Sequence, residues 1–209
     1  MRRRVALTGV VVLAMLGAVV VTPAGAARSE KVVRVEVPEA GISIAYPAAW
    51  SDTTKERQFE DDQWRRENPD IADSLEPLWF AAQDKGERIG AVQITTSVPT
   101  IFPEPGTPEP TLKQLIAEER DQAKFLEEEF LSAEKLPIGD MIGWRGDFGK
   151  RTKDGKKTYT SRRAELTLYY PRESPDGPKN VFVKVYGPLD AKGKQQADLV
   201  LRSIKLLPA

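Results

Sequence analysis

The segment Met141–Tyr170, MIGWRGDFGKRTKDGKKTYTSRRAELTLYY, carries the clearest structural signal in the chain. Residues 141–152 and 158–170 read as strands on either side of Lys153-Asp154-Gly155-Lys156. An Asp-Gly pair between two strand-like stretches is the strongest short-range signal of a β-hairpin. Asn180–Gly187 follows as another strand, with alternate valines on one face. The second half of the chain is therefore predicted to form a strand meander.

The first half adds shorter strands. Val33, Val35 and Val37 alternate with charged residues, and Ile42, Ile44 and Tyr46 alternate with small ones after a turn at residues 38–41. This period of two predicts a hairpin of half-buried strands. Two further strands are expected at residues 78–83 and 89–97.

Three helical regions complete the pattern. The charged stretch 51–76 is predicted to form two helices, the second capped by Asn68 with Pro69 at its first position. Thr111 and Gln114 form a capping-box pattern that opens a longer helix, expected to reach about Leu131 with Glu127, Glu128 and Glu129 on its solvated face. A closing helix follows Asp190. The proline-rich residues 99–110 are expected to form a semi-rigid loop, either a partner-binding edge or a spacer.

The N-terminus has the features of an export signal. Arg2, Arg3 and Arg4 precede an uncharged stretch from Val5 to Val21, and small residues follow at 24–26. This pattern predicts a signal peptide over residues 1–26, cleaved before Ala27, and a single domain over 27–209. The alternative is an uncleaved N-terminal signal anchor, since 17 apolar residues lie at the short edge of what spans a bilayer. The chain has no Cys, so no lipid anchor is expected.

Composition narrows the available functions. Without residues 1–26 the chain has 28 basic and 31 acidic side chains, a net charge of −3, which argues against nucleic-acid binding. The chain contains neither His nor Cys. That excludes Ser-His and Cys-His nucleophiles, thiol redox chemistry and zinc or copper sites built on imidazole or thiolate. No cofactor or metal site and no catalytic residues are predicted.

Several motifs resemble one known family. The segment GISIAYPAAW at residues 41–50 is similar to the opening strand and Tyr-Pro-Trp signature of the PsbP-like α/β/α sandwich family. Residues 68–75 followed by 78–81 resemble an element of its secreted bacterial members, including actinobacterial proteins related to LpqN, and residues 199–205 resemble its closing helix terminus. The resemblance implies an α+β fold, a mainly antiparallel β-sheet with α-helices on both faces. It also implies a non-catalytic role in binding protein partners.

The leading hypothesis is a secreted, non-enzymatic binding or accessory protein of the cell envelope or extracellular space, with an unknown envelope protein or an anionic surface as its partner. The candidate partner-binding residues are cations around the predicted hairpin, namely Lys150, Arg151, Lys153, Lys156, Lys157, Arg162 and Arg163. The same charges also suit a hairpin tip that stays soluble and avoids edge pairing.

Two other sites are open to more than one interpretation. Trp64 lies among charged residues and either packs its helix onto the sheet or lines a ligand groove. A carboxylate-dependent hydrolase would require paired acids such as Asp61 and Asp62, and a carrier would require an apolar cavity between sheet and helices.

Overall fold

The computed structural model describes residues 31–70, 76–84, 90–97, 111–154, 157–170 and 179–208. The predicted signal peptide and the proline-rich residues 99–110 lie outside these ranges. No helix within them is both long and apolar enough to cross a membrane.

Among the described residues the larger of two sheets has seven strands, and every pairing in it is antiparallel. In spatial order its strands are β3 (Trp50–Asp52), β4 (Leu78–Asp84), β5 (Ala91–Ser97), β9 (Lys179–Pro188), β8 (Lys157–Tyr170), β7 (Met141–Asp154) and β6 (Glu129–Ile138). The smaller sheet consists of β1 (Val32–Val37), β2 (Ile42–Pro47) and β10 (Lys205–Leu206). A short 3-10 helix, Pro38–Ala40, closes the predicted hairpin of β1 and β2.

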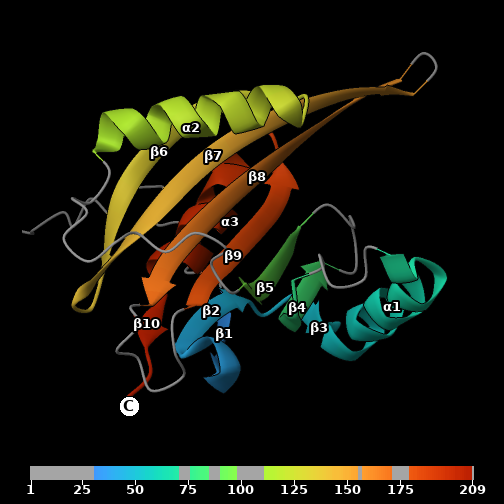
Figure 1. Ribbon diagram of the computed structural model, residues 1–209, viewed down its shortest axis with the longest axis vertical. Coiled ribbons are helices and arrows are strands. Elements are labelled where there is room, and N and C mark those ends of the chain that lie inside the picture. The colour runs from blue at the N-terminus through green and yellow to red at the C-terminus, as the bar shows by residue number, and fades with distance from the viewer. Residues whose placement is uncertain are drawn as a thin grey trace, which may run out of the picture.

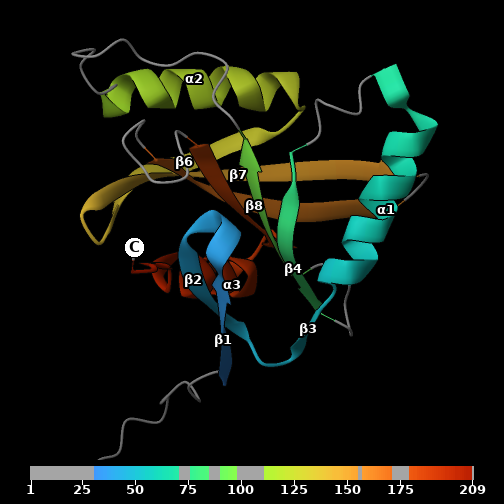
Figure 2. The ribbon, with the colours of Figure 1, turned by 60° about the horizontal axis from the view of Figure 1, so that its bottom comes forward.

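Helices cover both faces of the seven-stranded sheet (Figure 1). Helix α2 (Leu112–Phe125) lies on one face, over β6 and β7, while α3 (Ala191–Arg202) and the β1–β2 hairpin lie on the other (Figure 2). Helix α1 (Thr54–Glu67) packs beside β4 at the far side of the sheet. The predicted α+β class, a mainly antiparallel sheet between helices, is confirmed.

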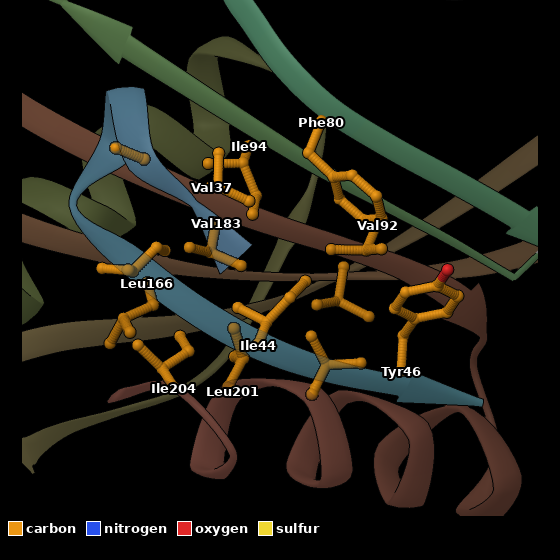
Figure 3. Close-up of a cluster of buried hydrophobic side chains, with 14 of the residues drawn as sticks. Val37, Ile44, Tyr46, Phe80, Val92, Ile94, Leu166, Val183, Leu201 and Ile204 are labelled. Atoms are coloured by element: carbon orange, nitrogen blue, oxygen red, sulfur yellow. The ribbon is translucent and has the colours of Figure 1, made fainter. Parts of the chain in front are cut away.

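The core lies between the sheet and the layer formed by α3 and β2. Ile44 of β2, Val183 of β9 and Leu201 of α3 meet in one buried cluster (Figure 3). Each of the three is fully buried, because β2 and the apolar face of α3 together cover this face of β9. This cluster joins the two sheets into one packed body.

The helix predicted to reach Leu131 is shorter. Thr111 and Gln114 form the expected capping box, but α2 ends at Phe125, and Glu127 takes a left-handed φ of 56° that stops it. The chain then enters β6, a strand that the sequence did not predict. Phe130, which lies within the predicted helix, instead belongs to β6, and its ring centroid is 6.2 Å from that of Phe148.

Asn68 also closes the helix that precedes it. Its backbone N–H and its side-chain amide both donate to the carbonyl oxygen of Trp64, each at 2.9 Å, so Asn68 caps the C-terminus of α1. Pro69 and Asp70 begin a 3-10 segment where the second helix was predicted to start, and residues 71–75 lie outside the described ranges. At the other end of the chain the Asp190 side chain accepts a 2.9 Å bond from the Gly193 N–H, as expected for the cap of the closing helix.

Candidate binding surface

Strands β7 and β8 extend farther than the strands beside them. On one side, β6 pairs with β7 only as far as Gly149, and on the other, β9 pairs with β8 only from Ser161 onward. Residues 151–154 and 157–160 pair only with each other and form a two-stranded arm, here called the basic ribbon. The basic ribbon projects past the end of α2 (Figure 1).

Exposed cations occupy this ribbon. Arg151 and Lys153 are exposed side chains of β7. At the ribbon's base, half-buried Lys150 donates from Nζ to the carbonyl oxygen of Leu126, at 3.1 Å. That carbonyl belongs to the C-terminal cap of α2, where the helix dipole favours a positive charge. Lys156 lies outside the described residues, and Lys157 is described only through its backbone at the start of β8.

Arg163 does not belong to the exposed surface, contrary to the sequence expectation. Its side chain is 9% exposed and pairs with two carboxylates: Nη2 lies 2.6 Å from Oε2 of Glu128, and Nη1 bonds Glu165. Its guanidinium carbon also stands 4.1 Å from the ring centroid of Phe148. Burial lowers the pKa of Arg163, but hydrogen bonding to Glu128 and the charge of Glu165 outweigh it and raise the pKa overall. Its charge is therefore neutralised inside the fold.

Arg162 faces the opposite side of the sheet and is also largely covered. Its side chain is 13% exposed, and its Nη1 lies 3.9 Å from Oδ2 of buried Asp147. Two consecutive strand residues point to opposite faces, and both faces are covered at this position. Arg162 and Arg163, which the sequence grouped with the hairpin, therefore form ion pairs inside the fold. The surface patch consists of Lys150 and the basic ribbon.

Trp64 and a surface cavity lie at the other side of the sheet. Trp64 is a half-buried side chain of α1 and is not among the residues that line the cavity. The cavity has a volume of about 350 Å³, and its lining residues are Arg57, Glu60, Asp61, Glu76, Leu78, Gln93 and Thr95. The lining is mostly polar, so it differs from the apolar lining that a carrier would require.

The carboxylates of this cavity differ in their surroundings. Glu60 pairs with Arg57 at 2.8 Å, and Glu76 pairs with Lys184 at 3.3 Å. Asp61 lines the cavity while its neighbour Asp62 is exposed, so the adjacent acids proposed for a hydrolase point in different directions. Burial raises the pKa of Asp61, with Glu60 and Asp62 adding to the rise and Arg65 and Arg57 opposing it.

Glu119, a half-buried acid of α2, provides a first testable prediction. Burial raises the pKa of Glu119, the charges of Glu165 and Glu118 add to the rise, and Arg163 opposes it. Folding therefore disfavours the charged form of Glu119. Its contribution to stability falls as pH rises above 4.5, the ordinary pKa of a glutamate, and the full cost is present once pH exceeds the raised value. We expect Glu119→Gln to raise the free energy of unfolding at pH 7 by about 0.5 to 1 kcal/mol.

Urea unfolding at pH 7 and at pH 4 measures this effect. The gain of Glu119→Gln is expected to shrink at pH 4, because wild-type Glu119 is then largely protonated. Glu118→Gln is the matched control, since Glu118 is an exposed neighbour on the same helix. An equal gain from both variants would assign the effect to helix charge rather than to burial of Glu119.

Comparison with known proteins identifies only distant structural likeness. No protein-family model matches the chain, and no curated protein matches it. Among solved structures, cyanobacterial PsbP (CyanoP) from Synechocystis sp. PCC 6803 is similar, with 14% identity, a TM-score of 0.48 and coverage of 89% of this chain and 98% of that one. The Ran-binding protein Mog1p from Saccharomyces cerevisiae has 12% identity, a TM-score of 0.46 and coverage of 86% and 97%. Neither likeness assigns the chain to a family, and relationship to the LpqN group stays a prediction.

Proposed function

We propose that the protein is an exported, non-enzymatic binding domain of the cell envelope or extracellular space that holds an anionic partner through its basic ribbon. The observation that carries this proposal is the extension of β7 and β8 beyond their neighbours, with Arg151 and Lys153 exposed on the free part. An isolated pair of strands is only marginally stable, and here the paired continuation into the sheet anchors it. A projecting arm of cations suits contact with a negatively charged surface.

The charge of the ribbon stands out against the rest of the chain. Residues 150–157 contain five basic side chains and one acid, whereas residues 27–209 together carry a net charge of −3. A local positive field on a weakly negative molecule orients it toward an anionic partner and repels its acidic faces from the same partner. The export signal predicted over residues 1–26 supports a location at or outside the envelope.

Reversing two of these charges tests the proposed function. The form secreted by cells expressing the full-length chain is recovered from the medium, its N-terminus is read by mass spectrometry, and its co-sedimentation with the producing cell's envelope is measured at low salt. We expect the double variant Arg151→Glu with Lys153→Glu to bind at least about tenfold more weakly, because each cation near an anionic surface contributes about 1 kcal/mol.

The control variant has the same change in net charge, but at two lysines outside the basic ribbon. Lys55 of α1 and Lys113, near the start of α2, are exposed residues. Figure 1 shows α1 and the start of α2 away from the basic ribbon. Their double replacement by Glu is expected to leave binding within twofold of wild type. Equal losses in both double variants would show a general charge effect and contradict the ribbon. A chain retained in the membrane with its N-terminus intact would instead support the signal anchor.

A further inference from the structure

Strand β1 leaves one edge of the smaller sheet open. The strand order of that sheet is β1-β2-β10, and within the described part of the chain no strand pairs with the other side of β1. All six residues of β1 pair with β2 in one unbroken register. An open edge of this kind presents backbone N–H and C=O groups that can pair with a strand from another molecule.

The other outer strands have features that oppose such pairing. β3 has three residues and β10 has two, and strands this short offer few groups for pairing. β6 is longer, but it contains Lys135 and Pro137, and its pairing with β7 has an irregular register at Phe130. Lysines, prolines and bulges all discourage pairing at an edge. β1 has none of these features, and four of its six residues are valine, which favours strands.

The hydrogen bonds between β1 and β2 determine which residues of β1 face the open edge. The Ala48 N–H donates to the Lys31 carbonyl oxygen at 2.8 Å, in the same register as the strand pairs that follow. Backbone groups along an antiparallel strand alternate between its two sides, so the odd-numbered residues of β1 direct theirs toward β2, as Lys31 does. The even-numbered residues, Arg34 and Glu36 among them, therefore direct theirs toward the open edge.

Only one register lets two copies of β1 pair with opposite charges facing each other. The hydrogen-bonded pairs must form between outward-directed groups of both strands, so even-numbered residues oppose even-numbered residues. When Arg34 opposes Glu36 of the second copy, the two-fold axis passes through Val35, and the pair of opposite charges occurs twice. Moving the second strand by two residues in either direction instead sets Arg34 against Arg34 or Glu36 against Glu36.

The apolar face of β1 also fits this register. Val35 lies opposite its own copy at the axis, where the side chains of a non-hydrogen-bonded pair come closest. Val33 lies opposite Val37 of the second copy. In the single chain Val33 is 41% exposed, so pairing would bury apolar surface that one copy leaves in water.

The charged face of β1 has side chains available to the second copy. Glu36 is exposed and makes no ion pair within the described residues. Arg34 is exposed as well, and its Nη1 donates to the Ser43 hydroxyl and to the Ser203 carbonyl oxygen, both at 3.2 Å. Its Nε and Nη2 make no hydrogen bond in the described part of the chain, so they can bind a carboxylate while Nη1 keeps its contacts.

We propose that two copies of this chain pair through β1 to form a two-fold symmetric dimer, in which the two smaller sheets join edge to edge and Arg34 of each copy opposes Glu36 of the other. Contacts of this symmetric kind are the commonest in homo-oligomers. Main-chain hydrogen bonds supply the attraction, and the Arg34–Glu36 pairs select the register. The inference goes beyond the proposed function, because it concerns a surface other than the basic ribbon.

Charge reversal tests the dimer and its register together. The secreted form is studied by sedimentation velocity over a range of protein concentrations, and wild type is expected to sediment as a dimer that dissociates on dilution. Arg34→Glu and Glu36→Arg are each expected to weaken the dimer about tenfold, because each sets like charges opposite each other at two positions. The double variant restores opposite charges and is expected to dimerise within about twofold of wild type. It also lacks the Arg34 bonds, so its recovery separates pairing from folding.

Single cysteines give an independent test of the axis, because the chain has no cysteine of its own. Val35→Cys is expected to form a disulfide-linked dimer on mild oxidation, since the two copies of residue 35 lie directly opposite each other in a non-hydrogen-bonded pair. Val33→Cys is the matched control. Its two copies would lie about 14 Å apart along the strands, too far for a disulfide.

The proposal is overturned by any of the following results. Wild type that stays monomeric at every concentration would exclude self-pairing and leave the edge of β1 to a strand of a different protein. A dimer that resists both charge reversals, or that the double variant does not recover, would exclude this register. Equal disulfide formation by Val33→Cys and Val35→Cys would show that the copies meet without a fixed axis. Binding of the envelope through the basic ribbon is measured separately and does not depend on these results.

Discussion

Replacing Arg145 with methionine is expected to lower the free energy of unfolding by about 3 to 5 kcal/mol, because the variant leaves the buried carboxylate of Asp147 and two partly exposed acids without their shared cation. The Arg145 side chain is 2% exposed. Its Nη1 lies 2.6 Å from Oδ1 of Asp198 and 3.2 Å from Oε1 of Glu134, and its Nη2 lies 3.1 Å from Oδ2 of Asp147. This one guanidinium therefore joins β6, β7 and α3.

The protonation behaviour of Arg145 reflects the same contacts. Burial lowers its pKa, but the charges of Asp147 and Asp198 and their hydrogen bonds outweigh burial, so the pKa is raised overall. Asp147 is only 4% exposed, and in the variant it would keep a hydroxyl bond from Ser132 and a distant cation in Arg162. A methionine fills the space of the arginine stem but supplies no charge, so the loss measures electrostatics more than packing.

Urea unfolding followed by circular dichroism measures this loss, with Arg202→Met as control. Arg202 also bonds Glu134, at 2.9 Å, but its side chain is 56% exposed. Exposed ion pairs contribute about 0 to 1 kcal/mol, so the control is expected to lose less than about 1 kcal/mol. Equal losses in the two variants would contradict the view that burial gives Arg145 its importance.

The arginine networks also show where sequence reasoning reaches its limit. The sequence pattern of a strand cannot show whether a charged side chain contacts water or a carboxylate from an element far away in the chain. Asp198 lies 53 residues from Arg145, and Glu128 lies 35 residues from Arg163. One available signal was missed: consecutive arginines in a central strand cannot both face solvent when both sheet faces are covered.

Local patterns predicted more than long-range contacts did. The pairing of β7 with β8, the β1–β2 hairpin and the two helix N-caps at Thr111 and Asp190 depend on neighbouring residues, and the described part of the chain contains all of them. The strand β6 was missed because Glu129 at its start and the two glutamates before it continued the charge pattern of α2. Only the left-handed backbone of Glu127 and the pairing of β6 with β7 separate the two elements. The sequence showed the cluster of cations in the basic ribbon. It did not show that the ribbon projects, because that depends on where the pairing of β6 and β9 ends.

The second large effect on stability is expected at Gly193, in the first turn of α3. A Cβ atom there would overlap the carbonyl oxygen of Pro188 and lie 2.9 Å from its carbonyl carbon. The backbones of α3 and β9 are also close at Gly187, where an added Cβ would lie 3.3 Å from the Cα of Gly193. The chain turns at this point from β9 into α3, and the Asp190 cap fixes the position of the turn.

Gly193→Ala has two opposing effects on stability, and their magnitudes decide whether the variant is more or less stable than wild type. Alanine favours a helix over glycine by about 1 kcal/mol. Against this, backbone atoms cannot yield as a flexible side chain can, so α3 would have to move away from β9, and forced repacking of this kind costs about 1 to 3 kcal/mol or more. Because α3 supplies Val200 and Leu201 to the core, its displacement would open the cluster in Figure 3. We expect a net loss of about 2 kcal/mol, observed as a lower thermal midpoint.

Lys194→Ala separates the two contributions. Lys194 is the next residue of α3 and is exposed, so its replacement tests helix propensity without any new contact and is expected to change stability by less than about 0.5 kcal/mol. Stabilisation by Gly193→Ala would mean that α3 and β9 separate at little cost and that this crossing does not position the helix. Destabilisation confined to Gly193→Ala would show that the close approach of the α3 backbone to Pro188 holds the helix layer against the sheet.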